Sequence, residues 1–177
     1  LKGASIKKEN CKAEHPLDSY NNYYLANCPQ GIMNVKQYEK ITLKEVYPGI
    51  DWVLYSNNSK GIKYDFIIHP GAKVSDIRLV YEGAAKLEQL GDKRLKLVTP
   101  FGDIQEGELY SYEAESKKEI VSRYAVARET GTDIDSHRSQ GSEATIERYE
   151  VVFQTGNYNR EETLVIDPPL VWATYYG

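Results

Sequence analysis

Hydrophobic and polar residues alternate along most of the chain beyond residue 38, and this alternation predicts β-strands. In IKYDFII (62–68), every second residue is apolar or aromatic, and Lys63 and Asp65 lie between them. Side chains two residues apart share one face of a strand, so this pattern is typical of a strand with one buried face. We therefore expect one face of this segment to contact the protein core.

Similar strand-like runs recur along the chain. They cover 38–46, 52–55, 62–68, 76–83, 85–90, 93–100, 108–114, 119–127, 145–153, 163–167 and 170–176. Turn-forming pairs such as Asn57-Asn58, Gly91-Asp92 and Gly102-Asp103 separate them at intervals of roughly 8 to 12 residues. No helical period persists for ten residues. The pattern predicts an all-β, antiparallel β-sandwich-like domain with little helix.

The chain divides into three parts by this criterion. Residues 1–37 are polar without clear alternation, and we expect an irregular segment that packs on the sheet. Residues 38–169 form the predicted sandwich core, and residues 170–177 begin the strand of a following repeat. Within the core, the Gly- and Ser-rich stretch 129–144 predicts a long, mobile polar loop.

Two Pro-Gly pairs predict tight turns at Pro48-Gly49 and Pro70-Gly71. Proline at the first central position and glycine at the second fit a type II turn. Asp51 follows the first of these turns at once, where a short acceptor side chain can bind turn amides. We therefore interpret these residues as structural.

Three aspartates allow a second interpretation. Asp51, Asp65 and Asp167 could supply the paired carboxyl groups of a hydrolase, because glycoside hydrolysis uses two carboxyl groups about 5 to 9 Å apart. Asp167 precedes Pro168-Pro169 and also fits a turn, whereas Asp65 fits a solvated strand face. We favour the structural roles and expect no enzyme activity.

The composition narrows the possible functions. Net charge is −4, and Lys and Arg are scattered among Asp and Glu without a basic stripe, which argues against nucleic-acid binding. No apolar run approaches the length of a membrane span, so we expect no membrane insertion. Fifteen tyrosines fit a half-buried sheet. Trp52 and Trp172, with exposed tyrosines, would instead be stacking platforms if the domain bound carbohydrate.

Motifs for metals and cofactors are weak. His15, His69 and His137 stand apart, without the spacing of a metal site, and we expect no metal or cofactor. Residues 133–143 begin like a calcium loop, but glycine comes too late for its sharp turn. Residues 57–59 match a glycosylation sequon, which is a frequent chance match.

Four blocks in order resemble a known family. They are YEKITLKEVYPGIDWVLY, GIKYDFIIHPGAKVSDIRLVYEGA, LKLVTPFGDIQE and LVIDPPLVWATYYG. The chain from about residue 20 resembles the uncharacterised domain that precedes SBBP-type β-propeller repeats in large secreted bacterial proteins of Bacteroidetes-like organisms. Trp52 replaces a usual aliphatic residue, and 129–144 resembles an insertion.

The resemblance implies an extracellular or cell-surface location and offers no catalytic residues. It implies a partner in the propeller repeats of the same chain, with a glycan or a surface protein as a further partner. In that oxidising context Cys11 and Cys28 are expected to form a disulfide. We therefore expect a non-catalytic structural or interaction module that supports the adjoining propeller and has a role in adhesion. Carbohydrate binding is the alternative, and hydrolysis is third.

Overall fold

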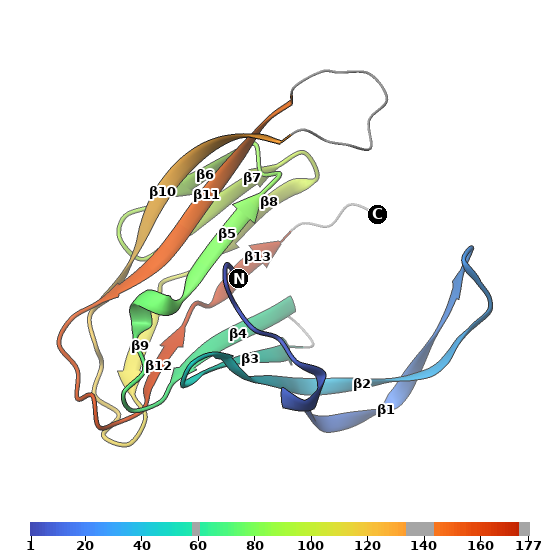
Figure 1. The fold of residues 1–177 in the computed structure, drawn as a ribbon, viewed down its shortest axis with the longest axis horizontal. Helices are drawn as coiled ribbons and strands as arrows, with labels where there is room; N and C mark the ends of the chain where they lie inside the picture. The colour runs from blue at the N-terminus through green and yellow to red at the C-terminus, as the bar shows by residue number, and fades with distance from the viewer. Residues whose placement is uncertain (58–60, 134–143, 174–177) are drawn as a thin grey trace.

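The computed structural model describes residues 1–57, 61–133 and 144–173 and shows an all-β protein (Figure 1). Two short 3-10 helices, η1 (Lys8–Asn10) and η2 (Val74–Asp76), interrupt the strands. The strands are β1 (Cys11–Leu25), β2 (Cys28–Tyr47), β3 (Ile50–Asn57), β4 (Gly61–Ile68), β5 (Arg78–Glu82), β6 (Lys86–Gln89), β7 (Leu95–Thr99), β8 (Gly102–Glu106), β9 (Tyr110–Glu113), β10 (Ser122–Asp133), β11 (Ala144–Thr155), β12 (Leu164–Asp167) and β13 (Leu170–Ala173).

Three antiparallel sheets form the body. The largest has the order β1-β2-β3-β4-β12-β9, the second β10-β11-β5, and the third β13-β8-β7-β6. Half of the consecutive strand pairs are neighbours in a sheet, as in hairpins. The long-range pairing that matters here is that of β12, which returns late in the chain to lie between β4 and β9.

One hydrophobic core lies between the three sheets. Each sheet contributes fully or nearly fully buried side chains, such as Phe66 from the first, Val151 from the second and Leu95 from the third. The alternation predicted for 62–68 is confirmed, because Phe66 and Ile68 are buried in this core. Burial of this apolar surface is the main force that holds the sheets together.

The first two strands extend well beyond the body as a two-stranded ribbon. Strand β3 pairs with β2 only from Lys40 onward, so residues 16–38 have no third strand beside them. We call residues 16–38 the arm. The arm projects from the body and bends along its length (Figure 1). Irregular pairing of β1 with β2 between Pro16 and Leu25 accompanies the bend, since bulges increase local twist.

Three sequence predictions about the fold were wrong. Residues 1–37 are not irregular, because 11–25 and 28–37 belong to the long strands β1 and β2. Gly102, which was interpreted as a turn residue, begins β8. The loop expected at 129–144 is shorter, since β10 continues to Asp133 and β11 begins at Ala144; residues 134–143 lie outside the described residues.

The expected disulfide between Cys11 and Cys28 is also wrong. Both cysteines are free. Cys11 begins β1 beside the body, whereas Cys28 lies at the tip of the arm, opposite Leu25. At about 3.3 Å per residue the strand between them covers roughly 40 Å, far beyond the ~7 Å between Cα atoms that a disulfide can bridge.

The two Pro-Gly turns are confirmed. Gly49 and Gly71 have φ angles of 69° and 84°, in the left-handed region that position three of a type II turn requires. Tyr47 pairs with Ile50 across the first turn. At Gly49 a Cβ atom would lie 3.0 Å from the Cβ of Ala72, so both conformation and space favour glycine there.

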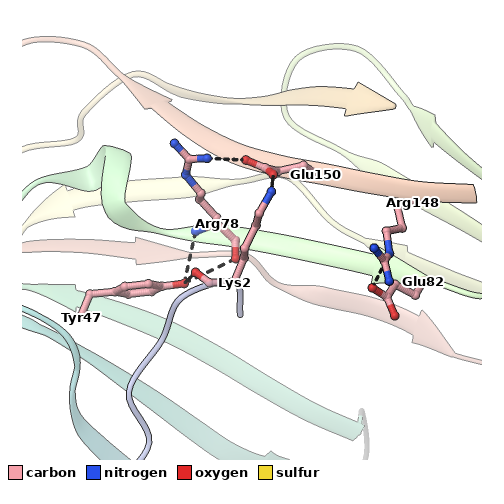
Figure 2. A network of polar contacts seen from close by, with 6 residues as sticks. All are labelled: Lys2, Tyr47, Arg78, Glu82, Arg148 and Glu150. Carbon is pink, nitrogen blue, oxygen red and sulfur yellow. Dashed lines mark hydrogen bonds and ion pairs between the residues drawn. The ribbon is translucent and has the colours of Figure 1, made fainter. Parts of the chain in front are cut away.

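The N-terminal segment joins the first two sheets (Figure 2). Lys2 Nζ lies 2.6 Å from Glu150 Oε2 on β11, and Arg78 of β5 contacts the other oxygen of Glu150 at 3.1 Å. The Tyr47 hydroxyl of β2 donates to the carbonyl of Lys2 at 3.0 Å. These contacts hold residues 1–5 across the seam, with Leu1 and Ala4 packed against the core.

Candidate functional site

Two aspartates meet on the outer face of the six-stranded sheet. Ile166 of β12 pairs with Phe66 of β4, and both face the core. Asp167 follows Ile166 and Asp65 precedes Phe66, so in this antiparallel pair the two aspartates lie opposite one another on the other face. Their carboxyl groups are hydrogen-bonded to each other. We call Asp65 and Asp167 the carboxyl pair.

A lysine and a tyrosine complete this site. Lys63 Nζ lies 2.7 Å from Asp167 Oδ2 and 3.9 Å from Asp65 Oδ1. Tyr55, which pairs with Lys63 across β3 and β4, donates a hydrogen bond to Asp65. Asp65 is only 8% exposed, although it lies on the outer face.

Burial and neighbouring charge change the titration of the site. Burial raises the pKa of Asp65 to about 6, and the charge of Asp167 adds to the shift. Burial also raises the pKa of Tyr55 to about 12, with the charge of Asp65 as the second cause. Burial lowers the pKa of Lys63, but the hydrogen bond to Asp167 and the two carboxylates outweigh it, so the net pKa is raised.

Two buried oxygen atoms, one from each aspartate of the carboxyl pair, account for this titration. Asp65 Oδ1 and Asp167 Oδ1 are both out of contact with solvent, and neither has a hydrogen-bond partner other than the opposite carboxyl group. One proton held between the two carboxyl groups removes the repulsion, as in other close carboxyl pairs. Below a pH of about 6 the site then contains a neutral Asp65 beside an ion pair of Lys63 with Asp167.

The geometry bears on the hydrolase alternative. Carboxyl groups that share a hydrogen bond are closer than the ~5 to 9.5 Å that retaining and inverting glycosidases use. Lys63 Nζ also donates a hydrogen bond to Oδ2 of Asp167 at 2.7 Å, so this carboxyl group already has a cationic partner. Thus the structure brings Asp65 and Asp167 together in an arrangement that does not match the spacing for glycoside hydrolysis.

Asp51 has a separate, structural position. Its Oδ1 accepts the backbone N–H of Glu45 at 2.8 Å, and its Oδ2 lies 3.1 Å from Nε2 of His69. Glu45 has a φ angle of 54° at a bulge in β2. Asp51 therefore binds a backbone amide beside the turn, as the sequence indicated. Asp167, by contrast, binds Lys63.

The predicted stacking residues lie in different surroundings. The Trp52 ring is stacked on Phe66 at 6.2 Å and meets Tyr64 edge-on, so its faces contact other rings at the border of the core. The side chain of Trp172 lies outside the described residues. Tyr110 and Tyr112 of the edge strand β9, which the sequence analysis did not single out, have rings 5.4 Å apart.

A second polar cluster, missed in the sequence, lies inside the core. Glu106 of β8 is 5% exposed and accepts hydrogen bonds from three tyrosine hydroxyls. The donors are Tyr64 of β4 at 3.0 Å, Tyr81 of β5 at 2.7 Å and Tyr124 of β10 at 2.9 Å. We call these four residues the Glu106 cluster. It joins all three sheets at one buried charge.

The pKa values of the three tyrosine hydroxyls in the Glu106 cluster are raised well above the usual range of tyrosine. Burial is the largest cause, and the charge of Glu106 or of a neighbouring tyrosine is the second. The hydroxyls therefore remain donors at any physiological pH. In sequence, Glu106 ends the polar run GDIQE and carries no signal of burial. Its role depends on partners distant in the chain.

The remaining sequence candidates give no site. In the described ranges 1–57, 61–133 and 144–173, no three His, Cys, Asp or Glu side chains come together as a metal site. The start of a calcium-like loop at Asp133 lies on β10, and its remainder lies outside those ranges, as do His137 and most of the sequon. No helix in the described part of the chain is long and apolar enough to cross a membrane.

Comparison with known proteins gives one match. A family model described as "Domain of unknown function (DUF7948)" matches residues 1–169. No curated protein matches the chain, and no solved structure matches it.

Proposed function

The chain belongs to this family of domains of unknown function, and we propose that it is a non-catalytic interaction module that holds a neighbouring domain of its own protein with its arm. The proposal includes an extracellular or cell-surface setting, in which the neighbour is the SBBP-type propeller that the sequence resembles. The exposed apolar surface of the arm is the observation that carries it.

Large hydrophobic side chains are concentrated on the arm. Of the eleven that are exposed in the described part of the chain, six lie there: Tyr20, Tyr23, Tyr24, Leu25, Ile32 and Met33. Residues 19–35 contain no charged side chain. Exposed apolar patches of this kind mark interaction sites, and surfaces rich in Tyr, Asn and Ser are typical of protein-binding loops.

The apolar side chains of the arm are widely accessible to solvent. Tyr23 and Tyr24 are adjacent in β1 and both are exposed, Tyr24 to 71%. A two-stranded ribbon alone is marginally stable in water. A partner that covers the arm would stabilise it and remove its apolar surface from water.

The position of β13 favours a partner in the same chain. The family match ends at residue 169, and β13 lies beyond it, although it pairs with β8. In Figure 1, β13 points toward the side of the body on which the arm extends.

The test is site-directed crosslinking in the complete natural protein. Cys28, at the tip, is labelled with a photo-crosslinker in a Cys11→Ser variant, and Cys11, at the base, is labelled in the matched Cys28→Ser variant. We expect crosslinks from Cys28 to sequence after residue 177, and their loss in Tyr23→Ser/Ile32→Ser without a change in melting temperature. Crosslinks from Cys28 to a second copy or to another molecule, or the absence of any crosslink, would contradict the proposal.

A second candidate function is carbohydrate binding. Tyr110 and Tyr112 have neighbouring rings on β9, the last strand of the six-stranded sheet, and Tyr110 pairs with Asp167 of the carboxyl pair. Aromatic rings beside carboxylates suit sugars, which stack on rings and donate hydroxyl hydrogen bonds. Binding on a glycan array that is lost in Tyr110→Ala/Tyr112→Ala would support it, whereas an array without signal would remove it.

A further inference from the structure

Lys63, Asp65 and Asp167 occupy the relative positions that an amide-forming reaction requires. The nucleophile, Lys63 Nζ, is 2.7 Å from Oδ2 of Asp167 on the adjacent strand. The carboxyl group of Asp167 is also hydrogen-bonded to Asp65. An amine, a carboxyl group and an acid in contact with that carboxyl group are thus held together by two neighbouring strands.

We propose that Lys63 and Asp167 condense to an isopeptide bond that covalently joins β4 to β12, with Asp65 as the acid that promotes the reaction. This inference concerns the body of the domain and is independent of the function of the arm.

The bond changes can be written completely from these three groups. A proton passes from the Lys63 ammonium to Asp167 within their ion pair, which gives an amine and a neutral carboxyl group. The amine lone pair attacks Cγ of Asp167. Asp65 donates its proton to the departing hydroxyl and receives the proton that the nitrogen loses. The C–N bond forms, the C–O bond breaks and one water leaves, so no oxidant or other reactant is needed.

The surroundings favour loss of water. Asp65 is 8% exposed, and Oδ1 of each aspartate is out of contact with solvent. Burial keeps Asp65 protonated to a higher pH than an ordinary aspartate, with a pKa of about 6. Held in place by strand pairing, the reacting groups need no further ordering, which is the largest gain of an intramolecular reaction.

The same molecule contains a matched ion pair for comparison. Lys96 of β7 and Asp103 of β8 lie 2.8 Å apart on adjacent strands, with side chains 28% and 32% exposed. Distance and strand arrangement are therefore similar in the two pairs. The difference is the buried acid that contacts Asp167. We expect no bond between Lys96 and Asp103.

Intact mass spectrometry of the purified, unfolded protein tests the proposal. We expect the natural chain to be lighter than its sequence by one water, and Lys63→Arg, Asp167→Ala and Asp65→Ala to have full sequence mass. Lys96→Arg should retain the loss. A tryptic digest should contain one branched peptide that includes both Lys63 and Asp167.

Two results would overturn the proposal. The first is a natural chain with full sequence mass after prolonged incubation in the folded state. The second is a loss of water that persists in Lys63→Arg, because cyclisation of another aspartate would then explain it. Arginine retains the positive charge but lacks the primary amine, so this variant separates loss of the bond from loss of folding, which circular dichroism reports.

Discussion

The hydroxyl of Tyr124 donates a hydrogen bond of 2.9 Å to Oε2 of Glu106 in the middle of the core. Tyr64 and Tyr81 donate to the other oxygen of the same carboxylate. A buried charge is costly unless hydrogen bonds replace its hydration. Three phenol donors from two sheets provide that replacement and determine how the sheets meet.

Glu106→Gln should lower the free energy of unfolding by roughly 2–3 kcal/mol, because the charge-assisted bonds are lost and the new amide donor has no acceptor. Tyr81→Phe should cost less, about 1–2 kcal/mol, since two donors remain. Urea denaturation followed by tyrosine and tryptophan fluorescence measures both. Equal stability of Glu106→Gln and the natural protein would show that the cluster does not hold the sheets.

Gly49→Ala and Gly71→Ala separate backbone strain from steric contact. Both glycines have positive φ, so each substitution should cost about 1 kcal/mol for the left-handed conformation. Only at Gly49 would the new methyl group meet a neighbour, Ala72, at 3.0 Å. Gly49→Ala should therefore cost about 1 kcal/mol more. The two melting curves, recorded side by side, give the difference; if Gly71→Ala were the more harmful change, the assigned cause would be wrong.

Asp51→Ala should destabilise the domain by about 1–2 kcal/mol, because the Glu45 amide loses its acceptor at the bulge of β2. Asp51→Asn keeps an acceptor oxygen and should cost clearly less. Thermal unfolding monitored by circular dichroism compares the variants. A similar loss in both would mean that the contact with His69 matters more than the backbone bond.

The carboxyl pair predicts a fall in stability with rising pH. The pKa of Asp65 is about 6 in the folded protein against an ordinary value of 3.8, so the folded state binds this proton more tightly. The stabilisation is complete below pH ~4 and is lost as pH rises through about 6.

We expect Lys63→Arg, in which no isopeptide bond can form, to lose roughly 1–1.5 kcal/mol between pH 5 and pH 8. Lys63→Arg/Asp65→Asn should lose clearly less, since asparagine does not titrate. Urea denaturation at the two pH values measures both losses. Identical losses in the two variants would assign the pH dependence to other groups.

Sequence alternation was sufficient for most strands of the body, although β8 was missed. Strands such as β4 and β11 alternate because one of their faces contacts the core, and that face leaves its period in the sequence. The strands of the arm, residues 16–38, contact the core on neither face. Their tyrosines and asparagines therefore show no clear alternation of apolar and polar residues. Extended structure there was therefore missed.

The polar sites depend on contacts that local patterns do not contain. Asp65 and Asp167 were both singled out, but only the return of β12 beside β4 brings them together. Glu106 ends a short polar run, and its burial depends on tyrosines from three other strands. Pairings over such distances require the sheet order, which one sequence does not reveal.

The wide separation of these partners along the chain affects the order of folding. Glu106 needs Tyr64 and Tyr81 from the sequence before it and Tyr124 from the sequence after it, and the sheet of β4 remains incomplete until β12 is made. Such non-local contacts slow folding in β proteins. During synthesis the arm emerges from the ribosome before β12, the strand that joins β4 to β9, so the nascent chain exposes the apolar side chains of the arm while the sheet beside it is still incomplete.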